Sequence, residues 1–166
     1  MNEDFMRRAI EIARESLDEE GALPYGAVVV KEGEIIGEGL NRSHGKSDPT
    51  SHGEVEAIRE ACRRLGTPTL PGCDLYTSCE PCAMCVATMY IAEIENLYYA
   101  STIAESAVFF GRLVEQNEKW SRRINAVELR REVGLPIEER SMPAQRILGD
   151  LGQEIFDDFV DRQNQS

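Results

Sequence analysis

Two short segments of this chain combine residue types that ligate metals, and each stands where a helix is expected to begin. The first segment is Ser51-His52-Gly53-Glu54, and the second is Cys79-Glu80-Pro81-Cys82-Ala83-Met84-Cys85. Residues three apart share one face of a helix, so Cys82 and Cys85 can bind one ion together. A helix N-terminus favours negative charge, which lowers the pKa of a thiol there. We therefore expect a fold in which the two helix starts converge.

The third ligand of such a site is expected from the first segment. The chain has two histidines, and His52 opens a helix two residues before Glu54. Three protein ligands leave the fourth tetrahedral position of zinc to water, as in catalytic zinc sites. Zinc lowers the pKa of that water to about 7, and a nearby carboxylate can then move its proton. The pattern predicts one catalytic zinc per chain, with His52, Cys82 and Cys85 as ligands and Glu54 as the proton carrier.

Two other interpretations of the cysteines stay open. Cys82 and Cys85 have the spacing of a redox pair, although a redox pair has no need of the His-x-Glu segment. They could also hold a structural zinc, for which Cys79 would supply a fourth ligand. We favour a non-ligand role for Cys79, because it lies before Pro81, outside the helix start, and would close the position left for water.

The overall charge and the cysteine count exclude several classes of protein. The net charge of −12 counts against a nucleic acid partner, which usually requires a basic surface. The odd number of cysteines, 5, argues against a disulfide framework. No stretch approaches the roughly 20 apolar residues of a membrane span, and the acidic N-terminus lacks the layout of a signal peptide. We expect a cytoplasmic protein with no membrane partner.

Hydrophobic periodicity predicts helices and strands that alternate along the chain, and 166 residues suffice for one domain with its own core. Strands are expected over residues 27–30, 35–40, 74–78 and 96–100. Helices are expected over residues 4–19, about 53–65 and 81–92, then around 120–134 and around 148–159. Such alternation indicates an α/β sheet covered on both faces.

Three stretches of this sequence match a known family. They are Pro24-Tyr25-Gly26-Ala27-Val28-Val29-Val30, Asp48-Pro49-Thr50-Ser51-His52-Gly53-Glu54-Val55-Glu56-Ala57-Ile58 and Leu75-Tyr76-Thr77-Ser78-Cys79-Glu80-Pro81-Cys82-Ala83-Met84-Cys85. The order His-x-Glu followed by Pro-Cys-x-x-Cys is the signature given for zinc deaminases. The chain therefore resembles the cytidine deaminase superfamily, and within it the guanine deaminase branch of small bacterial enzymes. The resemblance covers about residues 3–100 and returns near 138–143.

The resemblance implies a three-layer α/β/α fold with a five-stranded mixed sheet, and a homodimer. It implies the same zinc ligands, His52, Cys82 and Cys85, with Glu54 as the proton shuttle. Asn41 falls where the family has an asparagine that hydrogen-bonds the substrate ring. Residues 1–166 are expected to form a single deaminase domain, with 101–166 as a divergent segment that sets substrate specificity.

The chain departs from the guanine deaminase pattern in three places. Residues 106–112 lack the paired aspartates of that branch, one of which helps to read guanine. The chain ends in Gln163-Asn164-Gln165-Ser166 and lacks the tyrosine that closes over the site. Gly53 stands where the family usually has alanine.

The leading hypothesis is hydrolytic deamination of a small amino-heterocycle, with guanine or a related aminopurine as the best guess. One alternative keeps the chemistry and changes the substrate to cytosine, a nucleoside or a tRNA adenosine. Another alternative, from a different class, is a zinc-stabilised binding module that has lost catalysis. Specificity in pockets of this kind depends on where a few polar groups stand.

Overall fold

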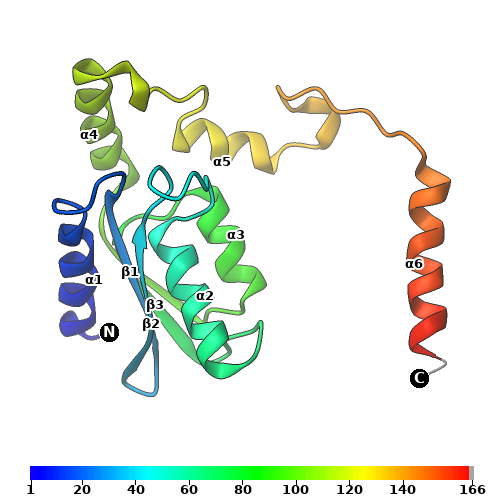
Figure 1. The fold of residues 1–166 in the computed structure, drawn as a ribbon, viewed down its shortest axis with the longest axis horizontal. Helices are drawn as coiled ribbons and strands as arrows, with labels where there is room; N and C mark the ends of the chain where they lie inside the picture. Colours follow the sequence, from blue (N-terminus) through cyan, green and yellow to red (C-terminus); the bar gives the residue numbers. More distant parts are fainter. Residues whose placement is uncertain (165–166) are drawn as a thin grey trace. The chain divides into compact units, whose positions relative to one another are not determined.

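The sheet of this protein is built around β1 (Leu23–Lys31), which pairs antiparallel with β2 (Glu34–Asn41) and with β3 (Cys73–Cys79). On its other side β3 pairs in parallel with β4 (Asn96–Ser101), so the sheet is mixed and its order is β2-β1-β3-β4. Strands β1, β2 and β3 are labelled in Figure 1, a view of the computed structural model. Residues 1–164 are described by the structure.

The two faces of the sheet are buried under different helices, because successive side chains of a strand point to opposite faces. On one face, Ala27 and Val29 of β1 join a cluster with residues of α2 (Gly53–Leu65) and α3 (Ala83–Ile91). On the other face, Val28 and Val30 pack with α1 (Glu3–Glu15). The predicted α/β/α layering is confirmed.

The sheet has four strands among the described residues, so the expectation of five strands was wrong. After β4 a capping box at Thr102 and Glu105 starts a helix, which takes this stretch out of the extended conformation. Further along, Pro136 and Pro143 lack the N–H that a strand interior needs. As a result β4 is an edge strand whose Leu97 and Tyr99 side chains are partly exposed.

Two predicted helix boundaries also need correction. The first helix ends at Glu15 and not near residue 19, because Leu17 is 80% exposed and adds nothing to the buried face. The third begins at Ala83, with Cys82 as its N-cap, so Pro81 lies before the helix and not at its first position. The β1 strand is longer than predicted and includes Pro24, Tyr25 and Gly26.

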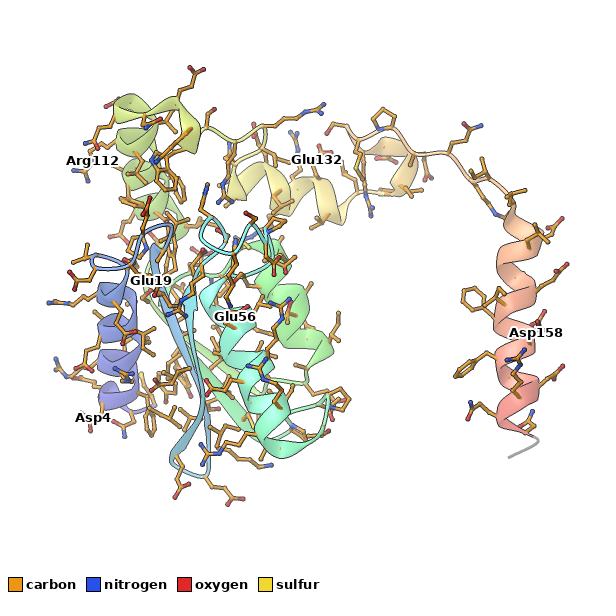
Figure 2. All side chains as sticks on the ribbon, viewed as in Figure 1. Asp4, Glu19, Glu56, Arg112, Glu132 and Asp158 are labelled. Carbon is orange, nitrogen blue, oxygen red and sulfur yellow. The ribbon has the colours of Figure 1, made fainter. Side chains whose placement is uncertain are left out.

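The segment after β4 is more helical than the sequence analysis indicated. The unpredicted helix α4 (Ile103–Gln116) is followed by a short 3₁₀ turn, η1 (Glu118–Trp120), and then by α5 (Ala126–Gly134). The single helix expected around residues 120–134 is thus interrupted over 121–125. Charged side chains cover the outer faces of the helices, among them Asp4 on α1 and Arg112 on α4 (Figure 2).

Two compact units make up the chain, Met1–Arg131 and Glu132–Ser166. The second unit contains a 3₁₀ turn, η2 (Ile137–Glu139), and the predicted C-terminal helix, α6 (Gly149–Gln163). One face of α6 exposes apolar side chains, including Ile155, Phe156 and Phe159. Gln165 and Ser166, part of the chain end without the family tyrosine, lie outside the described residues. Among the described helices, none has both the length and the apolar content to cross a membrane.

Candidate metal and substrate site

The predicted metal ligands stand at the N-terminal ends of two helices, as the sequence indicated. His52 is the N-cap of α2 and Cys82 is the N-cap of α3, both with extended backbone angles. An N-cap side chain commonly accepts a hydrogen bond from its own helix, but neither of these side chains does so. The imidazole and the thiol are therefore free of their own helices and meet each other with Cys85.

The three ligand atoms have the spacing that a tetrahedral zinc site requires. The Sγ atoms of Cys82 and Cys85 lie 3.6 Å apart, and the Nδ1 atom of His52 lies 3.7 Å and 3.4 Å from them. Zinc–sulfur and zinc–nitrogen bonds of usual length, held at tetrahedral angles, give edges of about 3.8 Å and about 3.6 Å. The residues present fit zinc, and within residues 1–164 this trio is the one cluster of metal-ligating side chains found.

The electrostatics of the cluster favour a bound cation. A hydrogen bond from Cys85 is the main cause that lowers the pKa of the Cys82 thiol to about 4, with a further contribution from His52. The pKa of the Cys85 thiol is raised by its hydrogen bond with Cys82 and by burial. Neighbouring thiolates repel each other, so both form together only when a cation lies between them.

Glu54 lies in the first turn of α2 and is 6% exposed. Burial raises the pKa of its carboxyl group, while the neighbouring His52 partly opposes that rise. A carboxyl group with a raised pKa can accept and return a proton near neutral pH, which is the property of a general acid and base. Its side chain lines the same cavity as His52 and Cys82.

A cavity of about 690 Å³ lies over the metal cluster and is lined by residues of the first compact unit. Asn41, at the end of β2, is 2% exposed and lines this cavity. Its Oδ1 atom accepts hydrogen bonds from the backbone N–H and the hydroxyl group of Ser43, at 3.1 Å and 2.9 Å. Those two bonds fix the amide orientation, so the Nδ2 donor is the end that can reach a ligand.

Cys79 lies outside the metal cluster. It is the last residue of β3, and its thiol donates to the carbonyl oxygen of Thr102 at 3.7 Å. Burial raises the pKa of this thiol to about 11, so it stays protonated at neutral pH. A Cys79 side chain that does not bind the metal is expected to lie in such a position. Cys73 belongs to the hydrophobic cluster that includes residues of α2, Cys62 packs against that cluster, and all five cysteines are free.

Comparison with known sequences decides the family. A profile of the cytidine and deoxycytidylate deaminase zinc-binding region matches residues 1–101, which include both metal-binding segments. The chain belongs to this family of zinc-dependent deaminases. The predicted zinc and the predicted hydrolytic deamination chemistry are therefore confirmed at the level of the family.

Two relatives show how far the likeness extends. The chain is 45% identical over 106 residues to the guanine deaminase of Bacillus subtilis (strain 168), which is 64% of this chain and 68% of that enzyme. It is 43% identical over 99 residues to the tRNA-specific adenosine deaminase of Aquifex aeolicus (strain VF5), which is 60% of this chain and 65% of that enzyme. The chain thus spans about two thirds of the length of these curated relatives.

Structural similarity covers more of the chain than sequence similarity does. The crystal structure of Bacillus subtilis guanine deaminase matches with a TM-score of 0.82 at 35% identity. That match covers 97% of this chain and 95% of the other. Most of the divergent segment of this deaminase, residues 101–166, therefore has a structural counterpart in that enzyme although its sequence has drifted.

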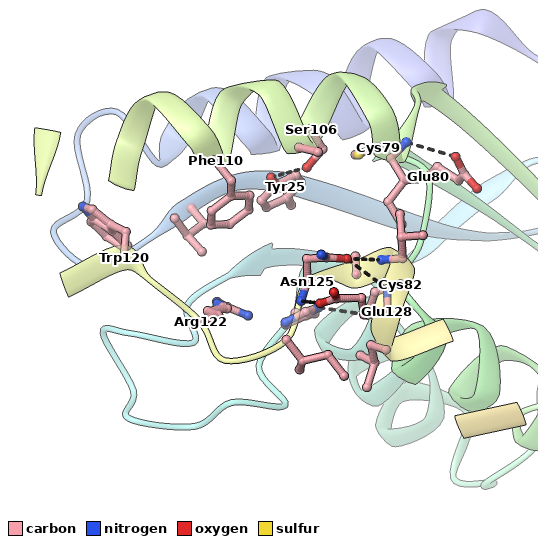
Figure 3. Close-up of a pocket in the computed structure, with 18 of the residues that line it drawn as sticks. Tyr25, Cys79, Glu80, Cys82, Ser106, Phe110, Trp120, Arg122, Asn125 and Glu128 are labelled. Carbon is pink, nitrogen blue, oxygen red and sulfur yellow. Dashed lines mark hydrogen bonds between the residues drawn. The ribbon is translucent and has the colours of Figure 1, made fainter. Parts of the chain in front are cut away.

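One wall of the cavity comes from that divergent segment, whose helix α4 was not predicted from the sequence. The Oη atom of Tyr25 and the Oγ atom of Ser106 on α4 share a hydrogen bond of 2.7 Å. The rings of Tyr25 and Phe110 stack with centroids 6.2 Å apart and planes 10° apart (Figure 3). The capping pattern Thr102-x-x-Glu105 before an apolar run was the signal that could have predicted α4.

Glu80 connects this wall to the metal-binding loop of the deaminase. Its Oε2 atom accepts a hydrogen bond of 3.0 Å from the backbone N–H of Ile103, at the start of α4. Its Oε1 atom binds Arg130 of α5 at 3.1 Å, and the same guanidinium donates to the Pro81 carbonyl at 3.2 Å. One side chain, two residues before the predicted metal ligand Cys82, therefore anchors both α4 and α5.

Proposed function

We propose that this deaminase hydrolyses the exocyclic amino group of guanine or a related aminopurine and releases ammonia. The observation that carries the proposal is the similarity to Bacillus subtilis guanine deaminase along nearly the whole chain, 97% in structure. The similarity to the tRNA-specific adenosine deaminase of Aquifex aeolicus covers 60% of the chain. A net charge of −12 also disfavours a polyanionic substrate such as tRNA.

The proposed roles of the residues follow from their places in the site. His52, Cys82 and Cys85 would hold zinc, which when bound makes a water molecule acidic enough to act as a nucleophile at neutral pH. Glu54 takes the proton of that water and delivers it to a ring nitrogen beside the reacting carbon. It would then take the remaining proton from the hydroxyl group on the reacting carbon and pass it to the departing amino group, so that water and substrate yield a carbonyl product and ammonia. Asn41 holds the ring through its Nδ2 donor.

We propose further that residues 1–166 act as a single deaminase domain in which 101–166 provides substrate specificity. Support comes from the cavity lining, which includes Ile103, Ser106 and Phe110 of α4 and Trp120 and Arg122 beyond it. The residues that approach the metal cluster from this segment differ in type from the aspartates of the guanine deaminase branch. Specificity would therefore depend on these side chains.

Ammonia release by the zinc-loaded protein tests this function. We expect turnover of guanine or another aminopurine, and no turnover of adenosine in a tRNA anticodon stem. A panel that also contains cytosine, cytidine, guanosine and pterins would show where specificity lies. Preferential deamination of tRNA, with the steep salt dependence of polyanion binding, would overturn the proposed substrate class while keeping the chemistry.

The homodimer implied by the family would bury an exposed apolar surface of the first unit. Tyr90 and Ile91 at the end of α3 are 81% and 78% exposed, and Leu97 and Tyr99 of the edge strand β4 are 37% and 48% exposed. Association buries apolar surface of this kind. We expect a dimer in sedimentation equilibrium, and a shift toward monomer in Tyr90→Glu. A wild-type monomer at micromolar concentration would contradict the dimer.

A cytoplasmic location is proposed from the chemistry of the metal ligands. A cluster that depends on two thiolates requires reduced cysteines, which the cytoplasm provides. Recovery of the active protein in a secreted fraction would contradict this location.

A further inference from the structure

The cavity lining includes two arginines, Arg122 and Arg123, and Arg122 contacts the aromatic wall of the cavity. Arg122 lines the cavity, and its guanidinium lies over the ring of Phe110, 5.6 Å from the ring centroid. Among the described residues it forms no ion pair, although the chain has 30 acidic against 18 basic residues. An arginine of a strongly acidic protein that remains unpaired in a cavity has its fork of donors available to a ligand.

The carboxylates that line the same cavity are already engaged. Glu80 binds Arg130 and the backbone of Ile103, as described above. Glu128 accepts a hydrogen bond of 3.3 Å from the backbone N–H of Asn125, at the start of α5. Glu54 lies beside the metal cluster. None of these carboxylates pairs with Arg122, so its guanidinium is available to an anion that enters the cavity.

The position of Arg122 places its charge near the reacting end of the cavity. Burial raises the pKa of Tyr25 to about 12, and the positive charge of Arg122 acts against that rise, so the two groups are close. Figure 3 shows Arg122 on the loop that faces Tyr25 and Phe110 across the cavity. A molecule that reaches the metal cluster would thus pass within reach of the guanidinium.

The size of the cavity leaves room for more than one ring system. Its volume of about 690 Å³ falls well inside the range of about 300–1,000 Å³ that encloses drug-sized ligands. Most of its exposed lining is apolar, from residues such as Phe110, Val114 and Trp120. An apolar chamber with an available guanidinium group suits a flat heterocycle that carries a charged group.

We propose that this deaminase acts on an amino-heterocycle that carries an anionic substituent, a carboxylate or a phosphate, and that Arg122 binds this substituent. The inference rests on the proposed function and narrows its substrate class. Guanidinium groups form bidentate hydrogen bonds with both kinds of anion, which makes them stronger partners than neutral acceptors. The net charge of −12 repels anions at a distance, so selective binding of one requires a local cation of this kind.

The test compares matched substrates that share a ring and differ in charge. Guanosine is paired with guanosine 5′-monophosphate, and pterin with pterin-6-carboxylate, so that phosphate and carboxylate are separate arms. With zinc-loaded protein we expect kcat/KM to favour the anionic member of at least one pair by about tenfold to a hundredfold, the value of a charge-assisted hydrogen bond. Arg122→Gln should remove that preference by lowering kcat/KM for the anionic member far more than for the neutral member.

Arg112→Gln is the matched control, because Arg112 is an exposed arginine of α4 that does not line the cavity. The control should keep the preference for the anionic member. Equal kcat/KM within both pairs, or an equal loss for neutral and anionic members in Arg122→Gln, would overturn the inference.

A binding measurement separates this inference from the proposed function. Isothermal titration of guanosine 5′-monophosphate and pterin-6-carboxylate into the zinc-loaded protein should give a Kd that rises at least tenfold in Arg122→Gln. Turnover of guanine without any preference for anions would leave the proposed function standing and overturn the inference. If no substrate releases ammonia, the proposed function fails, and an unchanged Kd in Arg122→Gln would overturn the inference as well.

Discussion

Glu54→Gln is expected to lower turnover by about 10²- to 10⁴-fold, the usual contribution of a positioned general acid and base. Glutamine has nearly the same shape as glutamate, so the buried position at 6% exposure tolerates it sterically. Its amide can neither accept the proton of water nor return one to the ring. His52, Cys82 and Cys85 are untouched by the change, and zinc should remain at one ion per chain.

Two measurements on the same preparation check this result: ammonia release and zinc content. Glu60→Gln is the matched control, since Glu60 lies on the same helix, is exposed, and does not line the cavity. It removes the same charge and should leave turnover within about twofold, because surface substitutions of this kind act weakly. Turnover by Glu54→Gln at the wild-type rate, with zinc bound, would exclude Glu54 as the proton carrier.

The metal-binding half of the site could be predicted because its chemistry is local. His52 and Glu54 are two residues apart, and Cys82 and Cys85 are three apart, so each pair is placed by a single helix start. The sequence does not give the distance between the two helix starts. A histidine at one start and two cysteines at the other are explained only if both starts converge on one metal ion. The structure brings the ligand atoms of all three residues within 4.8 Å of one another.

The individual residues of the opposite wall could not be assigned to the cavity from the sequence, because apolar side chains carry no chemistry that points to a particular partner. Phe110 and Trp120 have the same appearance in a sequence whether they fill a core or cover a cavity. Arg122 is one of several arginines in the sequence, and its role depends on which carboxylates lie close enough to pair with it. Pairing of this kind is decided by tertiary contacts, such as the one between Glu80 and Arg130.

Gly39→Ala is expected to destabilise the fold by about 3 kcal/mol, at the upper end of the usual range for overpacking. Gly39 lies on β2, and an added Cβ atom would clash with the carbonyl oxygen of Gly53 and come within 2.5 Å of the backbone nitrogen of Ala57. Both atoms belong to the backbone of α2, which cannot rotate away as a side chain can. The whole helix would have to move from the sheet.

The same displacement should weaken zinc binding, because His52 is the N-cap of the helix that moves. We expect a loss of zinc affinity of about 10- to 100-fold, comparable to the loss of a residue that supports a metal ligand. Competition with a chromophoric chelator measures the affinity, and urea unfolding measures the stability.

A matched glycine substitution separates the effect of the backbone clash at Gly39 from the general effect of replacing a glycine by alanine. Gly111 lies within α4, where an added Cβ atom would meet nothing within 4 Å. Gly111→Ala should raise stability by up to about 1 kcal/mol, since alanine is the better helix former, and leave zinc affinity unchanged. An unfolding midpoint for Gly39→Ala equal to the wild-type midpoint would show that α2 can shift on the sheet without cost. In that case the metal site would not depend on the close contact between β2 and α2, and His52 would have to be held by the cation alone.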